Sequence, residues 1–170
     1  YAIPLLIGIG IRLYLATRSA DQLLPYLIDD GFFHLQVAKH IALGHGPTFD
    51  GLHLTNGFHP LWVWMLAGLY WVFPDLHGSF FTASTVTQVL LNLGSSYFVW
   101  RLACFLSPRF SMRWMALVLY LLNPFVIFYT ITGMETSLYL FLLSLLMWQI
   151  VRTLESSRPS YLSIGIISAG

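Results

Sequence analysis

The sequence carries very little charge. Of its 170 residues, Lys and Arg contribute 8 and Asp and Glu 7, so charged residues make up 9% of the chain and the net charge is +1. Soluble domains carry roughly 25% charged residues, and a globule of this length exposes more surface than so few charges can cover. This balance excludes a soluble single domain, a nucleic-acid-binding protein and a disordered chain.

Cysteine is almost absent as well, because Cys104 is the only one. A single thiol cannot close an internal disulfide, which excludes a secreted disulfide scaffold. Hydrophobic residues, in contrast, make up 57% of the chain, and the mean hydropathy is +0.72. Long apolar stretches are stable where lipid replaces water. The composition therefore predicts an all-α fold, a polytopic transmembrane helical bundle.

Several apolar runs have the length of a membrane span or continue to an end of the sequence. Spans are expected at about 1–17, 79–106, 114–131, 136–151 and 161–170, with an outer loop at 18–78. The chain is treated as one unit, 1–170, the N-terminal part of a transmembrane domain. Both ends lie in apolar runs, which predicts a piece cut from a longer membrane protein. The Asn123-Pro124 pair is expected to kink the third span.

The apolar segment 61–73 decides the topology. As a helix it would be about 20 Å long, short for a hydrocarbon core of roughly 30 Å, and its Trp and Tyr residues favour the membrane interface. If it lies in the interface, Asp29, Asp30 and Glu135 share one side of the membrane, opposite five arginines. If it spans, the acid pair lies with the arginines instead. We favour the first arrangement, in which the arginine side is cytoplasmic. The arginines are Arg101, Arg109, Arg113, Arg152 and Arg158.

Asp29 and Asp30 open a helical pattern that Gly44 is expected to end. A helix N-terminus favours ionised carboxylate, and such a group suits a general base that removes a hydroxyl proton. Asp is also a common helix N-cap, and the two roles are compatible. His34 follows Asp30 by one helical turn, so a hydrogen bond between them is expected rather than a shared metal ion.

Glu135 precedes the apolar run at 136–151, and two interpretations remain open. With Thr132 three residues earlier, it has the spacing of a capping box. Alternatively, its carboxylate faces the same cavity as Asp29, where it would orient an acceptor, hold a cation or contact a sugar.

Two cations are candidates for substrate binding. Arg12 interrupts the first apolar run, and a cation there would pair with the phosphate of a lipid-linked substrate. Snorkelling to the interface, or pairing with an Asp of the loop, is the alternative. Lys39 is a second cation near the acid pair, although a solvated helix face is the favoured explanation for it. A polar stripe at helical spacing is expected to bond to neighbouring helices. The stripe consists of Thr85, Gln88, Asn92 and Ser95.

The histidines and acids of the loop match no metal-ligand spacing. No residue is therefore assigned as a metal ligand, and a divalent metal ion stays open as a cofactor.

A series of short motifs follows the first apolar run. They are Asp29-Asp30-Gly31-Phe32-Phe33, Gln36-Val37-Ala38-Lys39, Gly44-His45-Gly46, Phe49-Asp50-Gly51 and Thr55-Asn56-Gly57-Phe58-His59-Pro60-Leu61-Trp62. In this order they resemble the first outer loop of the GT-C glycosyltransferases. The bacterial members concerned are those similar to protein O-mannosyltransferases, lipid A aminoarabinose transferases and mycobacterial arabinofuranosyltransferases. Gly133-Met134-Glu135 before an apolar helix resembles a second motif of this group. The resemblance extends over about 12–151, and His34 and His40 depart from it.

The resemblance implies a multi-pass glycosyltransferase of the cytoplasmic (inner) membrane whose active-site loop lies on the periplasmic or extracellular side. Its donor would be a polyprenyl-phosphate sugar within the membrane lipid, and its acceptor a glycan, lipid or protein. Asp29 would be the base of an inverting displacement, Asp30 and Glu135 the other catalytic acids. Asn56 and His59 lie in the stretch expected to bind substrate.

Two other functions remain alternatives. One is a non-catalytic module of a membrane complex that binds or transports a lipid carrier. The other is a structural membrane subunit in which both acid motifs only cap helices. Transporters carry charges near the middle of the membrane, whereas the acids here cluster at the ends of the spans, which favours the transferase.

Overall fold

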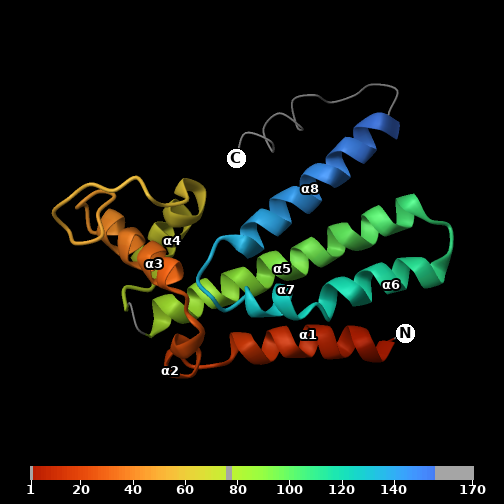
Figure 1. Ribbon diagram of the computed structural model, residues 1–170, viewed down its shortest axis with the longest axis horizontal. Coiled ribbons are helices and arrows are strands. Elements are labelled where there is room, and N and C mark those ends of the chain that lie inside the picture. The colour runs from red at the N-terminus through yellow and green to blue at the C-terminus, as the bar shows by residue number, and fades with distance from the viewer. Residues whose placement is uncertain (1, 76–77, 156–170) are drawn as a thin grey trace.

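The computed structural model describes residues 2–75 and 78–155, and within these ranges it is built from helices (Figure 1). The only β pairing in the described part is an isolated bridge between Thr48 and Leu54. The prediction of an all-α fold is confirmed. In order, the helices are α1 (Ala2–Ala16), α2 (Ala20–Leu23), the 3₁₀ helix η1 (Leu24–Tyr26), α3 (Asp29–Ala42), α4 (Pro60–Val72), α5 (Ser79–Leu106), α6 (Phe110–Leu121), α7 (Pro124–Phe128) and α8 (Thr136–Glu155).

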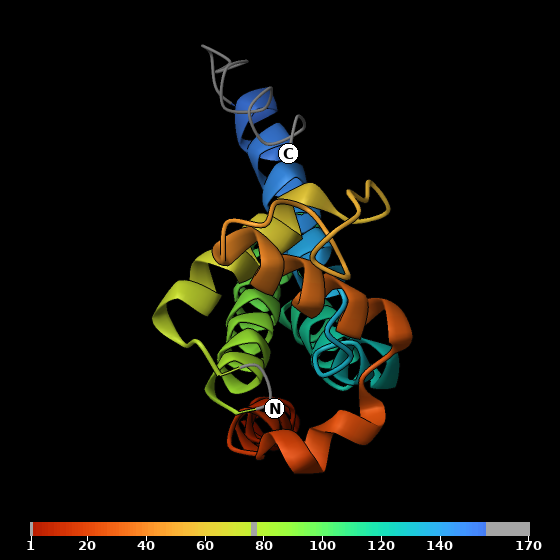
Figure 2. The same cartoon turned by 90° about the vertical axis from the view of Figure 1, so that its left-hand side faces the viewer.

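The long helix α5 forms the axis of the molecule. It contacts α1, α4, α6 and α8, while α3 packs on α4. Viewed along the bundle, α3 and α4 lie across one end of it (Figure 2). Helix α4 has 13 residues and lies with α3 at this end of the molecule (Figure 1). We call α3 and α4 together the end layer.

Two described helices are long and apolar enough to cross a membrane. They are α5, with 28 residues, and the segment Thr136–Leu154 of α8, with 19. The sequence predicted the bounds of α5, whereas α8 continues beyond the expected end at 151. A third candidate arises only if α1 and the short helices after it, which are bent by 118° at the break, count as one span. The run expected at 161–170 lies outside the described residues.

The span predicted at 114–131 is not one helix. Helix α6 ends at Leu121, and Asn123 takes an extended conformation with φ −64° and ψ 118°. Pro124 has no N–H and disfavours helical backbone at the residue before it. The Asn123 side chain then accepts bonds from Phe125 N and Val126 N, which caps the new helix α7. The expected kink is therefore a complete break.

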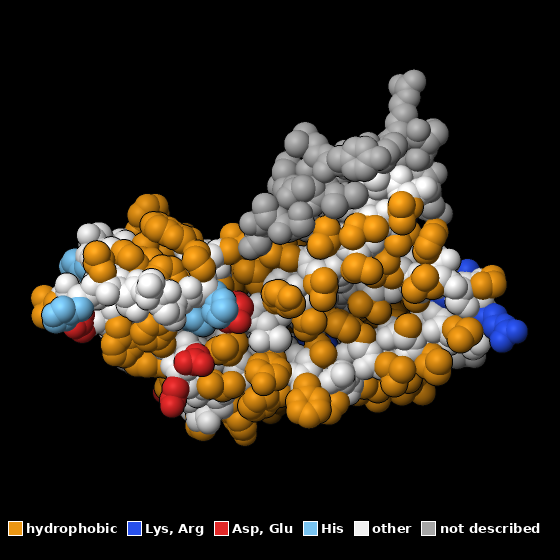
Figure 3. All heavy atoms as spheres, turned by 45° about the horizontal axis from the view of Figure 1, so that its top comes forward, with side chains coloured by type: hydrophobic (Ala, Val, Ile, Leu, Met, Phe, Trp, Pro, Cys, Tyr) orange, Lys and Arg blue, Asp and Glu red, His pale blue; other side chains and the backbone are white. Residues whose placement is uncertain are grey.

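Apolar side chains cover much of the bundle's outer surface. Figure 3 shows them over the helices, with acidic and histidine side chains toward the α3–α4 end and Lys or Arg at the opposite end. Arg109 precedes α6, Arg152 lies in the last turn of α8, and Arg101 stacks over Trp148 at 4.4 Å. An apolar belt between two polar ends is the pattern expected of a protein embedded in lipid. Arg158 lies outside the described residues.

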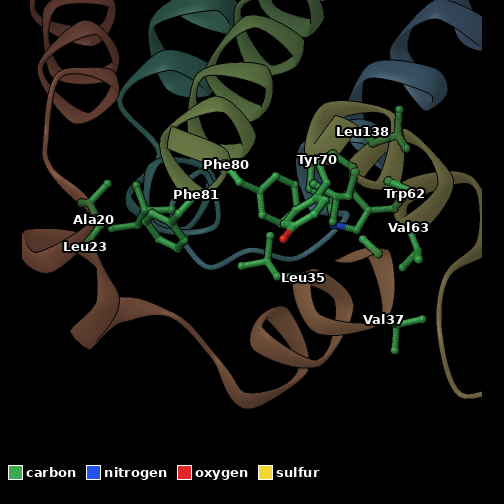
Figure 4. Close-up of a cluster of buried hydrophobic side chains, with 14 residues drawn as sticks. Ala20, Leu23, Leu35, Val37, Trp62, Val63, Tyr70, Phe80, Phe81 and Leu138 are labelled. Atoms are coloured by element: carbon green, nitrogen blue, oxygen red, sulfur yellow. The ribbon is translucent and has the colours of Figure 1, made fainter. Parts of the chain in front are cut away.

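A hydrophobic core fixes α3 and α4 to the start of α5. Trp62, Tyr70, Phe80 and Leu35 point toward one another there (Figure 4), and the rings of Tyr70 and Phe80 meet edge to face at 5.1 Å. All four side chains are buried. Burial of such large side chains contributes about 1.5–3 kcal/mol each, enough to hold the end layer in a defined position.

Arg12 is buried inside the bundle. Its Nε donates to Asn92 Oδ1 at 2.5 Å, and one terminal nitrogen donates to Gly8 O at 2.9 Å and Leu121 O at 2.6 Å. These partners belong to α1, α5 and α6, and none lies in an acid motif. The guanidinium is fully buried, so in this structure it bridges helices rather than meeting a phosphate.

Candidate functional site

The two acid motifs meet at a junction between the start of α3 and residues 129–135, which we call the Glu135 turn. Ile28 N donates to Thr132 O at 3.3 Å, directly before the acid pair. Gly31 is buried against the same backbone, where a Cβ would collide with Thr132 O. Gly133 has φ +78°, which only glycine adopts readily. These glycines bring Asp29 and Asp30 to the same end of the molecule as Glu135.

Side chains from two other helices hold the Glu135 turn in place. Trp62 Nε1 of α4 donates to Gly133 O at 3.0 Å. Gln88 of α5, with its amide nitrogen facing the turn, donates to Tyr129 O and Met134 O at 3.0 Å each.

The expectation that the polar stripe bonds to neighbouring helices is confirmed for Asn92, which accepts from Arg12 of α1. Gln88 bonds the Glu135 turn instead, a role that helical spacing does not predict. The hydroxyls of Thr85 and Ser95 donate to carbonyls of α5 itself.

Glu135 faces two histidines. Its Oε1 lies 3.4 Å from His59 Nε2, and its Oε2 lies 3.9 Å from His34 Nδ1. The two imidazole rings pack edge to face with centroids 5.4 Å apart. His34 is buried, Glu135 is half-buried and His59 is exposed. In the described part of the chain, this histidine–glutamate cluster is the only group of three or more His, Cys, Asp or Glu with donor atoms close enough to hold a metal ion.

Burial is the main influence on the titration of His34. It lowers the pKa of the imidazole below its ordinary 6.5, and Glu135 and, to a smaller extent, Asp30 act in the opposite direction. Desolvation disfavours the charged ring, so the neutral imidazole dominates near neutral pH. Of the acid pair, Asp30 is close enough to influence the His34 imidazole.

A pocket of about 130 Å³ opens beside the cluster. His59 and Glu135 line it together with apolar residues of α4 and α8, among them Trp62 and Leu138. Asp29 and Asp30 are exposed at the start of α3 and are not among the residues that line this pocket. A molecule in the pocket would therefore meet the Glu135 carboxylate and the His59 imidazole beside apolar side chains.

Both capping interpretations are wrong. Ile28 occupies the N-cap of α3, and the structure gives it no side-chain cap, so Asp29 and Asp30 are the first helical residues. Helix α8 begins at Thr136, and the Thr132 hydroxyl donates to Tyr129 O instead of capping it.

The other predicted site residues lie apart from the cluster or have different partners. His34 faces Glu135, and no hydrogen bond to Asp30 is present. Lys39 lies in the last turn of α3, half-buried, and Asn56 is exposed in the loop before α4. Lys39 makes no ion pair within the part of the chain that the structure describes.

The loop between α3 and α4 contains a pair whose titration can be checked directly. Asp50 accepts from Leu52 N and His53 N, and its Oδ2 lies 2.7 Å from His53 Nδ1. These bonds hold the pKa of Asp50 well below its usual 3.8 and raise the pKa of His53 above 6.5. The stability that ionised Asp50 contributes is present above the usual pKa of an Asp carboxyl and is lost as the pH falls below that value. The stability that protonated His53 contributes is lost as the pH rises through its raised pKa.

We expect Asp50→Asn to return the pKa of His53 toward its ordinary value, because the hydrogen bond and the negative charge disappear together. An NMR titration of the His53 ring measures this. Asp21→Asn, which removes an exposed acid elsewhere, should leave the titration unchanged. An unchanged His53 pKa in Asp50→Asn would contradict the pairing.

Comparison with known proteins yields no relative, since no family model, curated protein or solved structure matches the chain. The geometry of the junction, with two carboxylate motifs, two imidazoles and an adjoining pocket at one end of an apolar bundle, is what bears on its function.

Proposed function

We propose that the chain is part of a membrane glycosyltransferase that moves a sugar from a polyprenyl-phosphate donor to an acceptor hydroxyl. The observation that carries the proposal is the junction, because the Ile28–Thr132 bond and the close fit of Gly31 bring the acid pair and Glu135 to one end of the bundle. Carboxylates at opposite ends could not act on one substrate. The likeness of the motifs to the GT-C group supplies the reaction class.

In the proposed reaction, Asp29 removes the proton of the acceptor hydroxyl as its oxygen attacks the anomeric carbon. The bond from that carbon to the phosphate oxygen breaks, and the polyprenyl phosphate leaves with the electron pair. One displacement inverts the anomeric configuration. Glu135 would orient the acceptor from the other side of the junction, and the exposed Asp29 is accessible to it. Because Arg12 is buried, another cation has to meet the departing phosphate.

The apolar belt supports a location in a membrane. The position of the arginines, at the end away from the junction, indicates which face of the membrane the site opens to. The junction lies at the end opposite Arg101, Arg109 and Arg152. If the arginine end is cytoplasmic, the site opens to the periplasmic or extracellular face of the inner membrane.

The test is Asp29→Asn in the full-length protein, assayed for transfer of labelled sugar from a polyprenyl-phosphate donor. Loss of a general base lowers the rate by about 10²–10⁴-fold, while the exposed position predicts normal folding. Asp21→Asn, outside both motifs, is the matched control and should keep full activity. Turnover near that of the unchanged protein in Asp29→Asn would remove this residue as the base.

A module that binds or transports a lipid carrier is the second candidate. The 118° bend between α1 and the short helices after it favours this function, because broken helices are common in transporters. The same assay separates the two candidates, since a carrier module would bind the donor without consuming it.

A further inference from the structure

We propose that His34, His59 and Glu135 form a binding site for a divalent transition metal ion of the zinc type. One ligand atom from each residue lies within 4.8 Å of the other two. The Glu135 carboxylate is 3.4 Å from the His59 nitrogen and 3.9 Å from the His34 nitrogen. Ligand atoms on a tetrahedral zinc ion are roughly 3.3 Å apart, given zinc–ligand bonds of about 2.0–2.1 Å. A small movement of His59 and Glu135 brings all three to that spacing.

The buried state of His34 is the second observation. This residue is 2% exposed, and its Nδ1 has no hydrogen bond within the part of the chain that the structure describes. Glu135 Oε2, which faces it, is also without a hydrogen bond there. Buried polar atoms of native proteins are nearly always bonded, and an unbonded pair aimed at each other requires an explanation. A bound cation satisfies both atoms at once.

The types of donor decide which ion fits. Magnesium and calcium prefer oxygen donors, whereas imidazole nitrogen suits zinc, cobalt, nickel and copper. Two imidazoles and one carboxylate form a His₂Glu set, which occurs in zinc enzymes whose fourth position is open. His59 and Glu135 also line the pocket of about 130 Å³, so the fourth position opens into it.

Two of the three ligands are held on rigid elements. His34 is packed within α3, and Trp62 and Gln88 fix the turn that carries Glu135. His59 immediately precedes Pro60, the first residue of α4, and its exposure leaves it room to close on an ion. If the proposed function holds, the open position would take an oxygen of the donor's phosphate and supply the positive charge that buried Arg12 does not.

The experiment is a Co²⁺ titration of the full chain in detergent after removal of metal with a chelator. Cobalt in a four-coordinate site gives a strong visible absorption band, and Zn²⁺ should displace it. We expect one ion per chain, with affinity lowered at least about tenfold in His59→Gln and in Glu135→Gln. His53→Gln, an exposed loop histidine outside the cluster, should bind as the unchanged protein does.

The inference is overturned if the unchanged chain binds no ion, if His53→Gln loses as much affinity as His59→Gln, or if Mg²⁺ displaces Co²⁺ as readily as Zn²⁺ does. Because His59 is exposed, its substitution should leave the fold intact, and an unchanged circular dichroism spectrum verifies this. The titration contains no sugar donor. Its failure would leave the assay of Asp29 unaffected, and failure of that assay would leave the metal site unaffected.

Discussion

Gly31→Ala is expected to separate the acid pair from the Glu135 turn and to destabilise the protein by about 2–4 kcal/mol. The added Cβ would collide with Thr132 O, a backbone atom that cannot rotate away, and would crowd Gly133 Cα and Leu27 Cδ1 at 3.1 Å each. Overpacking costs about 1–3 kcal/mol, and loss of the adjoining Ile28–Thr132 bond adds about 1 kcal/mol. Transfer activity should fall too, because Asp29 and Glu135 no longer share one site.

Gly68→Ala is the matched control for this prediction. Gly68 lies within α4, and nothing is within 4 Å of a Cβ added there. Alanine in an open helical position stabilises by about 0.5–1 kcal/mol relative to glycine. Thermal unfolding in the same detergent should therefore move the midpoints in opposite directions. Equal midpoints for the two variants would show that α3 does not depend on close contact with the turn.

Arg12→Leu is expected to cost about 2–6 kcal/mol of stability. Helix α6 ends at Leu121, and the N–H that would bond its carbonyl, that of Phe125, donates to Asn123 instead. Arg12 supplies the missing donor to Leu121 O and also bonds Asn92. Its removal leaves two buried acceptors unbonded, and each costs about 1–3 kcal/mol.

Arg109→Leu makes the same chemical change at an exposed position before α6 and should have little effect on stability. Unfolding of both variants by heat in detergent compares them directly. If the unfolding midpoint of Arg12→Leu equals that of Arg109→Leu, the Arg12 guanidinium does not hold α1 to α5 and α6. In that case the earlier hypothesis, in which Arg12 meets a phosphate, regains its basis.

The sequence allowed the long elements to be predicted because their signals are local. Helix α5 is a long, largely apolar run with Arg101 as its only charge, and α3 is bounded by an acid pair and by Gly44, which has φ +84°. The break at Asn123-Pro124 was expected only as a kink. The mean hydropathy of the segment changes little with one such pair, so the apolar run still looks continuous in the sequence. In the structure the Asn123 side chain caps a new helix, which makes the break complete.

The site was predictable only in part, because its decisive contacts join distant segments. Trp62 and Gly133 are 71 positions apart. Helical spacing makes His34 a neighbour of Asp30, but packing of α3 against the rest of the end layer turns its imidazole toward Glu135. Likewise, the spacing of Gln88 predicts an inward-facing amide without predicting that it braces a turn.

The bond between Trp62 and the Glu135 turn couples motions that would otherwise be separate. Trp62 lies in the first turn of α4, and His59 is the residue directly before that helix. The first residues of α4 also line the pocket. Displacement of α4 by an incoming molecule therefore carries the indole, the imidazole and the turn together. We therefore expect ligand binding next to α4 to change the position of the Glu135 carboxylate, because the hydrogen bond from the Trp62 indole connects α4 to the Glu135 turn.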